Sequence, residues 1–290
     1  MFLLDIERRG ITVCLELSSK NIVTSYSNNS FFSQISIWNT TSFSLIKSSV
    51  YNFAISYLFE FSNSYLITGL NNGKIVIWNL LNLTVFKEFS EKHINRVTSI
   101  IVLKYGRFTS SSSLDKTIRI WDIVQHISCI VYSNYINTLL DLEDGLFASG
   151  FDDKTIKVWF KSNFSLVRTI NQISEVRSLI KLNETDLIVA LKNMEVKTLD
   201  LLTWSEKKAI KFNSQVTSVI VFFESKYLGV GLYDGSLEIF ETLNFNHFLT
   251  IKNDTRPINS IQYLSNLNSI SICSEGSFYE CNLLSLSSYF

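Results

Sequence analysis

Stretches in which hydrophobic and polar residues alternate recur along the chain, and most of them carry a large hydrophobic side chain at or directly before their last position. Alternation with a period of two is typical of a β-strand with one buried face. The clearest copies are residues 33–39, 73–79, 116–122 and 154–159, and weaker copies follow at 195–200, 235–240 and 276–281. Consecutive copies lie 38 to 43 residues apart, measured at their anchor residues, which are Trp38, Trp78, Trp121, Trp159, Leu199, Phe240 and Cys281.

The third copy belongs to a period that contains four predicted strands, at 97–103, 107–111, 117–121 and 127–132. Turn-forming residues separate these strands. Four strands in about 40–45 residues are typical of one blade of a β-propeller. We therefore predict an all-β fold, a seven-bladed β-propeller of four-stranded antiparallel blades. The inner strands are the more apolar ones, so we expect them to face neighbouring blades on both sides.

The composition is that of a large folded domain. Hydrophobic residues make up 46% of the 290 residues and there is a single proline, which excludes intrinsic disorder and a proline-rich linker. No helical periodicity is sustained and no linker interrupts the repeats, so we predict one propeller domain over residues 1–290. No uncharged apolar stretch reaches the roughly 18 residues of a membrane helix, so we expect no membrane span.

Charge and cysteine usage narrow the classes of partner and compartment. Lys+Arg and Asp+Glu both total 26, and this zero net charge argues against a nucleic-acid partner, which favours a basic face. Cys14, Cys129, Cys273 and Cys281 lie far apart without a Cys-x-x-Cys motif, so we predict reduced, mostly buried thiols. The N-terminus lacks the features of a signal peptide. We expect a cytoplasmic protein, with the nucleus as the alternative.

The segment around His93 resembles the repeat of the WD-repeat family. Residues 92–97 read Lys-His-Ile-Asn-Arg-Val, similar to the family's Gly-His-x-x-x-Val, and the repeats resemble the family over nearly the whole chain. The resemblance implies a buried hydrogen-bonded network within a blade, because a buried imidazole and indole both need partners. The residues at the matching positions are His93, Ser111, Asp115 and Trp121 in the third repeat and Ser149, Asp153 and Trp159 in the fourth, where Tyr132 replaces the His.

The same resemblance implies that the last blade borrows its outer strand from the N-terminus. Residues 2–6 are the predicted source of this strand, and the C-terminal residues 286–290 are the alternative. Closure removes the exposed edges of an open stack of sheets. A six-bladed open propeller, completed by a partner's strand as in some coat and pore scaffolds of the family, is a further alternative.

Catalytic and metal-binding chemistry finds little support in the sequence. His93 and Asp115 have the residue types of a general base and its orienting acid, but their spacing fits the structural network better. His126 and His247 stand alone, without a metal-ligand spacing to a Cys, Asp or Glu. The carboxylates of Asp152, Asp153 and Asp234 fit tight turns. We expect no catalytic residues, no cofactor and no metal.

Loops that precede the inner strands of a propeller form one rim of the central channel, and loops on a rigid scaffold often carry function. Because Arg and Tyr are common at interfaces, we hypothesise that this rim binds an acidic or phosphorylated peptide. The alternative is an ordinary solvated rim. The predicted rim residues are Arg9, Asn52, Arg96, Tyr135, Glu175, Gln215 and Arg256.

These observations predict a non-catalytic protein–protein interaction scaffold that belongs to a larger complex and binds partner proteins or peptides through the rim. A substrate-recognition subunit of a ubiquitin ligase is a second class. Many WD-repeat receptors of that kind carry Trp-Asp-x-Arg, whereas residues 121–124 here read Trp-Asp-Ile-Val. A propeller enzyme is a third class, which would need a convergent cluster of perturbed carboxylates or histidines in the channel.

Overall fold

The structure is a computed structural model, which describes residues 2–4, 11–27, 32–42, 44–103, 107–112, 115–122, 128–132, 134–252, 255–265, 267–274 and 277–282. Side chains are described for these residues except 2–4, 107–112, 122, 128–132, 143, 277–280 and 282.

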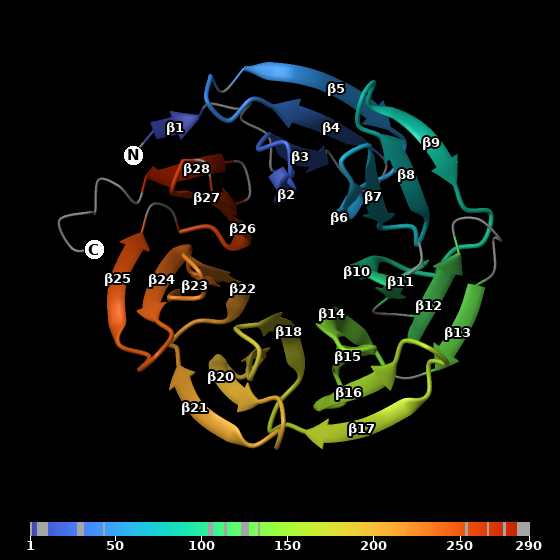
Figure 1. Cartoon of the computed structure of the whole chain (residues 1–290). Helices are drawn as coiled ribbons and strands as arrows, with labels where there is room; N and C mark the ends of the chain where they lie inside the picture. The colour runs from blue at the N-terminus through green and yellow to red at the C-terminus, as the bar shows by residue number, and fades with distance from the viewer. Residues whose placement is uncertain are drawn as a thin grey trace.

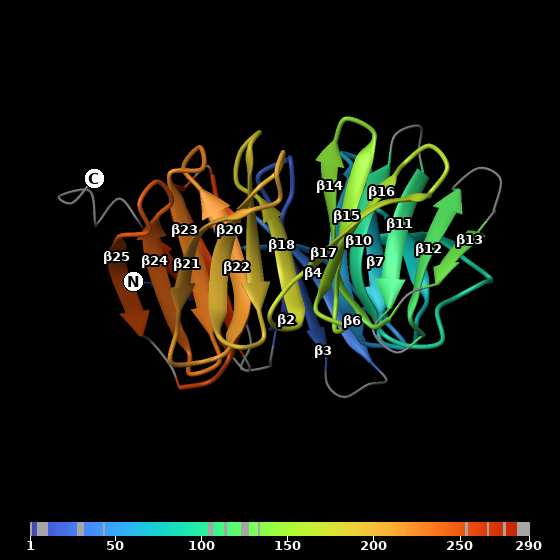
Figure 2. The same cartoon turned by 90° about the horizontal axis from the view of Figure 1, so that it is seen from below.

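Within the described residues, the strands form seven four-stranded antiparallel sheets that stand around a central axis as the blades of a propeller (Figure 1). Seen from the side, the strands of every blade run roughly along that axis (Figure 2). The first three blades are β2 (Ile11–Glu16), β3 (Ile22–Ser27), β4 (Ser33–Trp38) and β5 (Leu45–Tyr51); β6 (Ile55–Ser62), β7 (Tyr65–Leu70), β8 (Ile75–Asn79) and β9 (Thr84–Glu88); and β10 (Val97–Leu103), β11 (Arg107–Ser112), β12 (Thr117–Asp122) and β13 (Ser128–Tyr132).

The next three blades follow the same order from the inside of the ring to the outside. They are β14 (Ile136–Glu143), β15 (Leu146–Phe151), β16 (Thr155–Phe160) and β17 (Leu166–Asn171); β18 (Val176–Lys181), β19 (Asp186–Leu191), β20 (Glu195–Asp200) and β21 (Glu206–Lys211); and β22 (Val216–Phe222), β23 (Tyr227–Leu232), β24 (Ser236–Glu241) and β25 (His247–Lys252). The four strands predicted in the third repeat are confirmed, with boundaries that differ by at most one residue.

The last blade takes strands from both ends of the chain. It contains β26 (Ile258–Leu264), β27 (Ser269–Ser274) and β28 (Ser277–Asn282), and its outer strand is β1 (Phe2–Leu4). Strand β1 pairs antiparallel with β28, with Phe2 opposite Glu280 and Leu4 opposite Phe278. The N-terminal segment therefore supplies the outer strand from within the same chain, next to β28 (Figure 1). Residues 286–290 lie outside the described part.

Burial in each blade depends on the strand's distance from the channel. The second strands are almost wholly buried, as in β23 and β27, where all six residues are buried. The inner strands are less buried, and in β18 only the first and fourth residues are buried while the others are half-buried. Each inner strand lies beside the inner strands of both neighbouring blades, as β10 does between β6 and β14, so the expectation of a neighbour on both sides is confirmed. The free edge of the strand borders the channel. The outer strand β21 is mostly exposed, because solvent covers its outer side.

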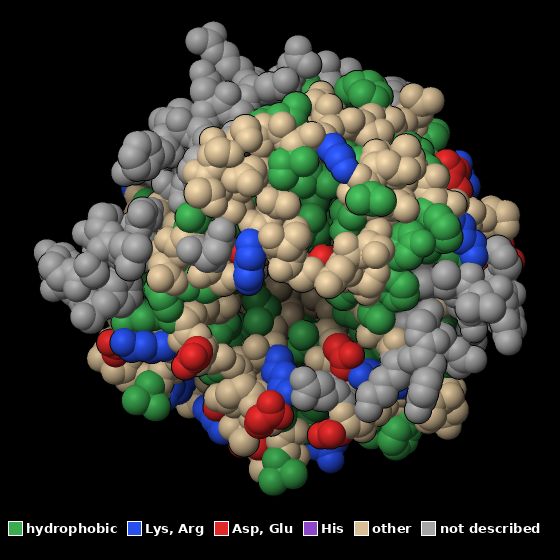
Figure 3. Space-filling model, turned by 45° about the horizontal axis from the view of Figure 1, so that its top comes forward, with side chains coloured by type: hydrophobic (Ala, Val, Ile, Leu, Met, Phe, Trp, Pro, Cys, Tyr) green, Lys and Arg blue, Asp and Glu red, His purple; other side chains and the backbone are tan. Residues whose placement is uncertain are grey.

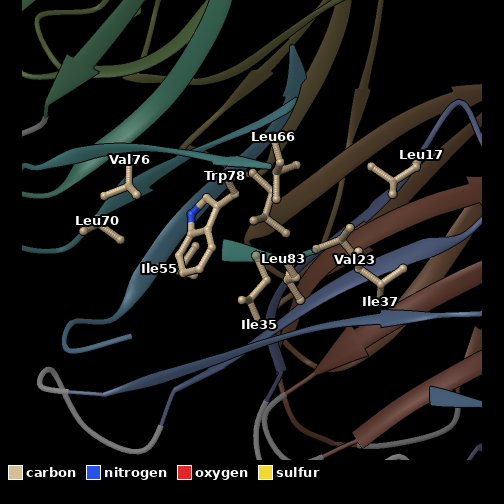
Figure 4. Packing of buried hydrophobic residues seen from close by; sticks show 11 residues of the cluster. Leu17, Val23, Ile35, Ile37, Ile55, Leu66, Leu70, Val76, Trp78 and Leu83 are labelled. Atoms are coloured by element: carbon tan, nitrogen blue, oxygen red, sulfur yellow. The ribbon is translucent and has the colours of Figure 1, made fainter. Parts of the chain in front are cut away.

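Each boundary between neighbouring blades holds its own hydrophobic cluster. The cluster between the first and second blades contains Ile35 and Ile37 of β4 and Trp78 of β8, and Trp78 is 1% exposed (Figure 4). Burial of a side chain of this size stabilises the folded state by several kcal/mol. Among the described residues, the smallest such cluster lies where the last blade meets the first.

Small residues in the second strands let neighbouring blades approach. Gly69 of β7 lies under Val97, the first residue of β10, and a Cβ added there would lie 2.5 Å from Val97 Cγ1. Gly150 of β15 stands in the same relation to Val176, also at 2.5 Å. A larger residue at either position would push the next blade away, because packed interiors leave no room for an added methyl group.

Candidate functional site

The inner strands carry a repeated irregularity at the end where they begin. In every blade, the pairing between the first and second strands shifts at the second residue of the inner strand. A β-bulge of this kind leaves one residue unpaired and turns its side chain out of the regular alternation. The residues at the seven shifts are all polar, namely Thr12, Ser56, Thr98, Asn137, Arg177, Thr217 and Asn259.

Four of these side chains link neighbouring blades. Thr12 Oγ1 donates to the carbonyl of Ile55 at 3.3 Å, and Ser56 Oγ donates to the carbonyl of Val97 at 2.7 Å. Thr98 and Asn137 repeat the contact, each at 2.8 Å, to the first residue of the next inner strand. The bulges therefore hold the first five blades in register beside the channel. Sequence analysis missed this set, although a β-branched residue followed by a polar one marks each position.

The bulged residues line a central cavity of about 600 Å³, together with side chains from all seven inner strands. Figure 3 shows one face of the ring, hollowed at its centre, with hydrophobic side chains inside the hollow and charged side chains around it. Concave sites that combine an apolar wall with a few polar groups are the usual places for binding. Among the cationic side chains that line this cavity are Arg96 and Arg177.

Arg96 lies directly before β10 at the mouth of this channel. Within the described residues, no carboxylate or other acceptor lies within bonding distance of its guanidinium, and only its backbone N–H has a partner, Asn95 Oδ1 at 2.7 Å. Partial desolvation lowers the pKa of Arg96, although an arginine remains a cation at neutral pH. The channel mouth therefore presents a positive charge without a described counter-ion.

Arg177, in contrast, is already neutralised. Its Nη1 lies 3.5 Å from Asp152 Oδ1, and Asn137 Nδ2 donates to the same carboxylate oxygen at 2.7 Å. Asp152 stands in the turn between β15 and β16, so it joins two blades through these contacts. Sequence analysis assigned Asp152 to a tight turn and did not single out Arg177. The visible signal for Arg177 was its position after Val176 at the start of an inner strand.

The predicted rim residues differ in how close they lie to the start of the inner strand of their blade. A backbone hydrogen bond from the turn between the second and third strands reaches the residue before the inner strand, and Tyr135, Glu175 and Gln215 accept it at 3.0, 2.9 and 2.8 Å. In the second blade Ala54 accepts this bond at 2.8 Å, so the equivalent position is Ala54 rather than Asn52. Arg256 lies one residue further from its strand than the others, and Arg9 lies outside the described residues.

Two of these rim side chains already have partners of opposite charge or an aromatic contact. Glu175 Oε1 forms an ion pair with Lys192 Nζ at 3.0 Å. Its own backbone N–H, Lys192 and Ser174 lower the pKa of Glu175 to about 2. Lys116 Nζ lies 4.7 Å from the ring centre of Tyr135, a cation–π contact. Among the described residues, Arg96 thus lacks the counter-charge that Glu175 has in Lys192.

The His93 segment forms a buried polar cluster behind Arg96. His93 is fully buried, and its Nδ1 lies 2.5 Å from Asp115 Oδ2 and 3.1 Å from Thr117 Oγ1. Asp115 also accepts from the backbone N–H of Ile94 and from Thr117. Burial raises the pKa of the Asp115 carboxyl, but the bonds from His93 and Thr117 outweigh it and hold the pKa below its ordinary value. The cluster therefore orders the loop that carries Arg96.

Trp121 stands with its ring centre 6.2 Å from that of His93, and the side chain of Ser111 lies outside the described residues. In the fourth blade, Trp159 Nε1 donates to Ser149 Oγ at 2.7 Å. Asp153 of that blade accepts from Thr155.

Two further tryptophans have partners that sequence analysis missed. Trp38 Nε1 donates to Thr24 Oγ1 at 2.9 Å, and Trp78 Nε1 donates to Thr68 Oγ1 at 3.0 Å. Thr68 precedes Trp78 by ten residues, the same spacing as Ser149 and Trp159, so its position was visible in the sequence. Thr24 lies fourteen residues before its tryptophan, so the spacing of ten does not identify it.

The other candidate histidine forms a surface contact. His247, which was expected to stand alone, is half exposed, and its Nε2 lies 2.7 Å from Glu238 Oε2. His126 lies outside the described residues. In the part of the chain that the structure describes, no group of three or more His, Cys, Asp or Glu side chains is placed to hold a metal ion. In that same part, no helix has the length and hydropathy needed to cross a membrane.

Comparison with known proteins places a recognised repeat over this cluster. The family model described as "WD domain, G-beta repeat" matches residues 85–122, from β9 to the end of β12. The resemblance to WD-type repeats is therefore confirmed for this segment, which includes His93, Arg96 and Asp115. The matched repeat begins in the outer strand of one blade and ends in the third strand of the next.

Two curated proteins and one solved structure are similar to the chain. Periodic tryptophan protein 2 of Arabidopsis thaliana is 22% identical over 215 residues, which are 71% of this chain and 24% of that protein. Myosin heavy chain kinase C of Dictyostelium discoideum is 29% identical over 116 residues, 37% of this chain and 14% of that protein. The chain thus spans a quarter or less of the length of these relatives.

The solved structure is the crystal structure of the computationally designed Ika8 protein. It superimposes with a TM-score of 0.73 at 17% identity and covers 97% of this chain and 98% of that one. At this identity the likeness concerns the fold alone.

Proposed function

We propose that residues 1–290 act as one non-catalytic interaction platform, which binds partner proteins or peptides at the channel mouth where the inner strands begin. Propellers with WD-type repeats are typical protein-interaction scaffolds. The observation that carries this proposal is Arg96, whose guanidinium lies at the mouth of a cavity of about 600 Å³ without a counter-ion among the described residues. A carboxylate or phosphate of a partner would supply that counter-ion through two parallel hydrogen bonds.

The loops near the starts of the inner strands, where Arg96 lies, suit a protein partner better than a small ion. Ile94 lies two residues before it and is 83% exposed. Ile173, in the loop before β18, is 62% exposed, and Tyr233 is 58% exposed beside the backbone of Gln215. Exposed apolar residues around a charged anchor are a common composition of interfaces. We infer that the partner places an acidic or phosphorylated residue over the channel and apolar residues on the loops around it.

The other partner classes fit less well. A nucleic acid would favour a basic face, and Arg177 and Lys192 at this end are already paired with Asp152 and Glu175. Among the described residues, Arg177 and Glu175 at the channel mouth are held in ion pairs and Arg96 is a cation without a counter-ion, so no exposed acid–base pair is present there. This favours binding over catalysis. A cytoplasmic location and membership of a larger complex remain part of the proposal.

The test compares the partners of two charge-reversed variants. The intact, tagged chain is purified from its own cells at physiological salt, and co-purifying proteins are identified and quantified. We expect Arg96→Glu to weaken the retained partner by about tenfold or more, because a buried interfacial arginine is often a dominant contact. Arg168→Glu reverses an exposed charge on the outer strand β17 and serves as the matched control, with unchanged binding expected. Equal partner binding by wild type and Arg96→Glu contradicts the proposal.

A further inference from the structure

Two cysteines from opposite ends of the chain meet where the last blade joins the first. Cys14 lies in β2 and Cys273 in β27, and they are 2% and 0% exposed. Their Sγ atoms are 2.8 Å apart, although 259 residues separate them in the sequence. Both are free thiols. The ring closure alone brings this pair together.

The fold explains why Cys273 faces Cys14. In the pairing of first and second strands, Cys273 lies opposite Ser260, the position that Gly69 and Gly150 occupy in their own blades. Small residues at this position lie under the inner strand of the next blade, and for the last blade that inner strand is β2. A cysteine at this position therefore directs its sulfur at the first blade.

The two thiols differ in chemical character. The Cys273 thiol donates to the Cys14 sulfur, and this bond lowers the pKa of Cys14 against the opposing effect of burial. Burial raises the pKa of Cys273 well above its ordinary value. Ser260 Oγ, 3.7 Å from the Cys14 sulfur, gives it a second polar neighbour. Cys14 is therefore the thiol that ionises first, and the thiolate is the form that reacts with oxidants.

Among the described residues, the junction at which they meet has the smallest apolar cluster of the ring. Its apolar cluster contains Ile11, Cys14, Ile22, Leu264 and Cys273, fewer buried residues than each of the other clusters among the described residues. The β1–β28 pairing covers only three residues. The remaining described polar contacts across the junction join Glu16 and Lys20 to Ser265 at the exposed surface. A disulfide between Cys14 and Cys273 would therefore join the first and last blades covalently and hold the ring closed.

We propose that Cys14 and Cys273 form an oxidation site, at which a peroxide converts the two thiols into a disulfide that joins the first and last blades. The Cys14 thiolate attacks one oxygen of hydrogen peroxide, the O–O bond breaks, and Cys14 sulfenic acid and hydroxide form. The Cys273 sulfur then displaces the sulfenic oxygen, which leaves as water after taking up the thiol proton. In total, two thiols and one peroxide give one disulfide and two waters.

The disulfide changes how the propeller unfolds. It closes a loop that contains nearly the whole chain, and cross-links across long loops restrict the unfolded state most strongly in the chain-entropy account. The reduced ring can separate at the junction by release of β1 and opening of the small cluster, whereas the oxidised ring cannot. A thiol reductant reverses the change, because the disulfide is exchanged back to two thiols.

The experiment treats the full chain with hydrogen peroxide, blocks remaining thiols with an alkylating reagent and maps peptides without reduction. We expect a cross-linked peptide pair that contains Cys14 and Cys273, which disappears after dithiothreitol. The oxidised protein is expected to melt about 5–10 °C above the reduced protein in thermal unfolding. The double variant C129S/C281S keeps the proposed pair and serves as the matched control, with the same cross-link and the same shift.

A second set of variants separates the pair from a general effect of oxidation. C14S and C273S should each abolish the peroxide-dependent rise in melting temperature, and the reduced forms of both are first compared with reduced wild type to account for any loss of folding. Cross-links of Cys14 or Cys273 to Cys129 or Cys281 in the native protein overturn the proposal. So does a Cys14–Cys273 pair that stays fully reduced at peroxide levels that oxidise Cys281, or equal melting temperatures of oxidised and reduced wild type.

Discussion

At the scale of single residues, the most consequential contact is between His93 and Asp115. Neither side chain is more than 1% exposed, and each satisfies polar atoms that would otherwise be buried without partners. The carboxylate also binds the backbone of Ile94 and thereby holds the loop that leads to Arg96. An unpaired buried polar group costs about 1–3 kcal/mol, more than a hydrogen bond gains, so loss of one partner should be felt strongly.

We therefore expect Asp115→Asn to lower the free energy of unfolding by about 1–3 kcal/mol at pH 7, measured by urea titration. Asp153→Asn is the matched control, since Asp153 makes the same contacts with a threonine two residues later but its side chain is 29% exposed. Its expected loss is below about 1 kcal/mol. A loss of the same size in both variants would show that the histidine contact adds nothing.

The contribution of Asp115 should depend on pH. Its pKa in the folded protein is held below the ordinary value by the bonds from His93 and Thr117. A lowered folded pKa adds stability that is complete above the unfolded pKa, about 4, and declines as the pH falls through the folded pKa. The difference in free energy of unfolding between wild type and Asp115→Asn should therefore be constant from about pH 5 to 7. It should shrink below about pH 4. A difference that grows with acidification would contradict this assignment.

At the scale of elements, a tight turn within one blade binds the loop that leads to the next blade. Gly73, in the turn between β7 and β8, has a φ of +85°, and its carbonyl accepts from the backbone N–H of His93 at 3.0 Å. A Cβ at this position would lie 2.0 Å from the carbonyl oxygen of His93, a main-chain atom that cannot move aside without moving the loop. The glycine therefore provides both the left-handed conformation and the space for the neighbouring blade's loop.

Gly73→Ala should accordingly destabilise the protein by more than the conformational cost alone. Gly145 is the matched control, because its φ is +78° and a Cβ there would meet nothing within 4 Å. We expect Gly145→Ala to cost about 1 kcal/mol from the left-handed conformation. Gly73→Ala should cost at least about 2 kcal/mol more, since the clash adds to the same strain. Equal losses of unfolding free energy in the two variants, measured by chemical denaturation, would mean that the loop at His93 moves aside without an energetic penalty.

At the scale of the whole molecule, stability depends on closure of the ring. Each blade buries one face against the next, so the first and last blades keep exposed faces unless they meet. In the part of the chain that the structure describes, the short β1 is the strand that joins the two ends of the chain within one sheet. The edge of β28 would otherwise present unpaired backbone groups, which favour association with other chains.

A variant lacking residues 2–4 should therefore melt at a lower temperature and associate at high concentration, as measured by calorimetry and light scattering. A variant lacking residues 286–290, the alternative closing segment in the sequence, provides the comparison. We expect the N-terminal deletion to cause the larger loss, because the backbone pairing involves Phe2, Leu3 and Leu4. A larger loss of melting temperature from the C-terminal deletion would show that the C-terminal segment, and not the N-terminal one, closes the ring.

The sequence alone determined the local features, because they follow from short-range periodicity. The strand at 117–121 was visible in its alternation, and the tryptophan–hydroxyl spacing of ten residues was visible in Ser149 and Trp159. Contacts between blades were decided only by the tertiary structure. Arg177 is neutralised by a turn of another blade while Arg96 is not, and Cys14 meets Cys273 across 259 residues. No local pattern encodes these pairs, because they depend on how far each blade turns from the last and on where the ring closes.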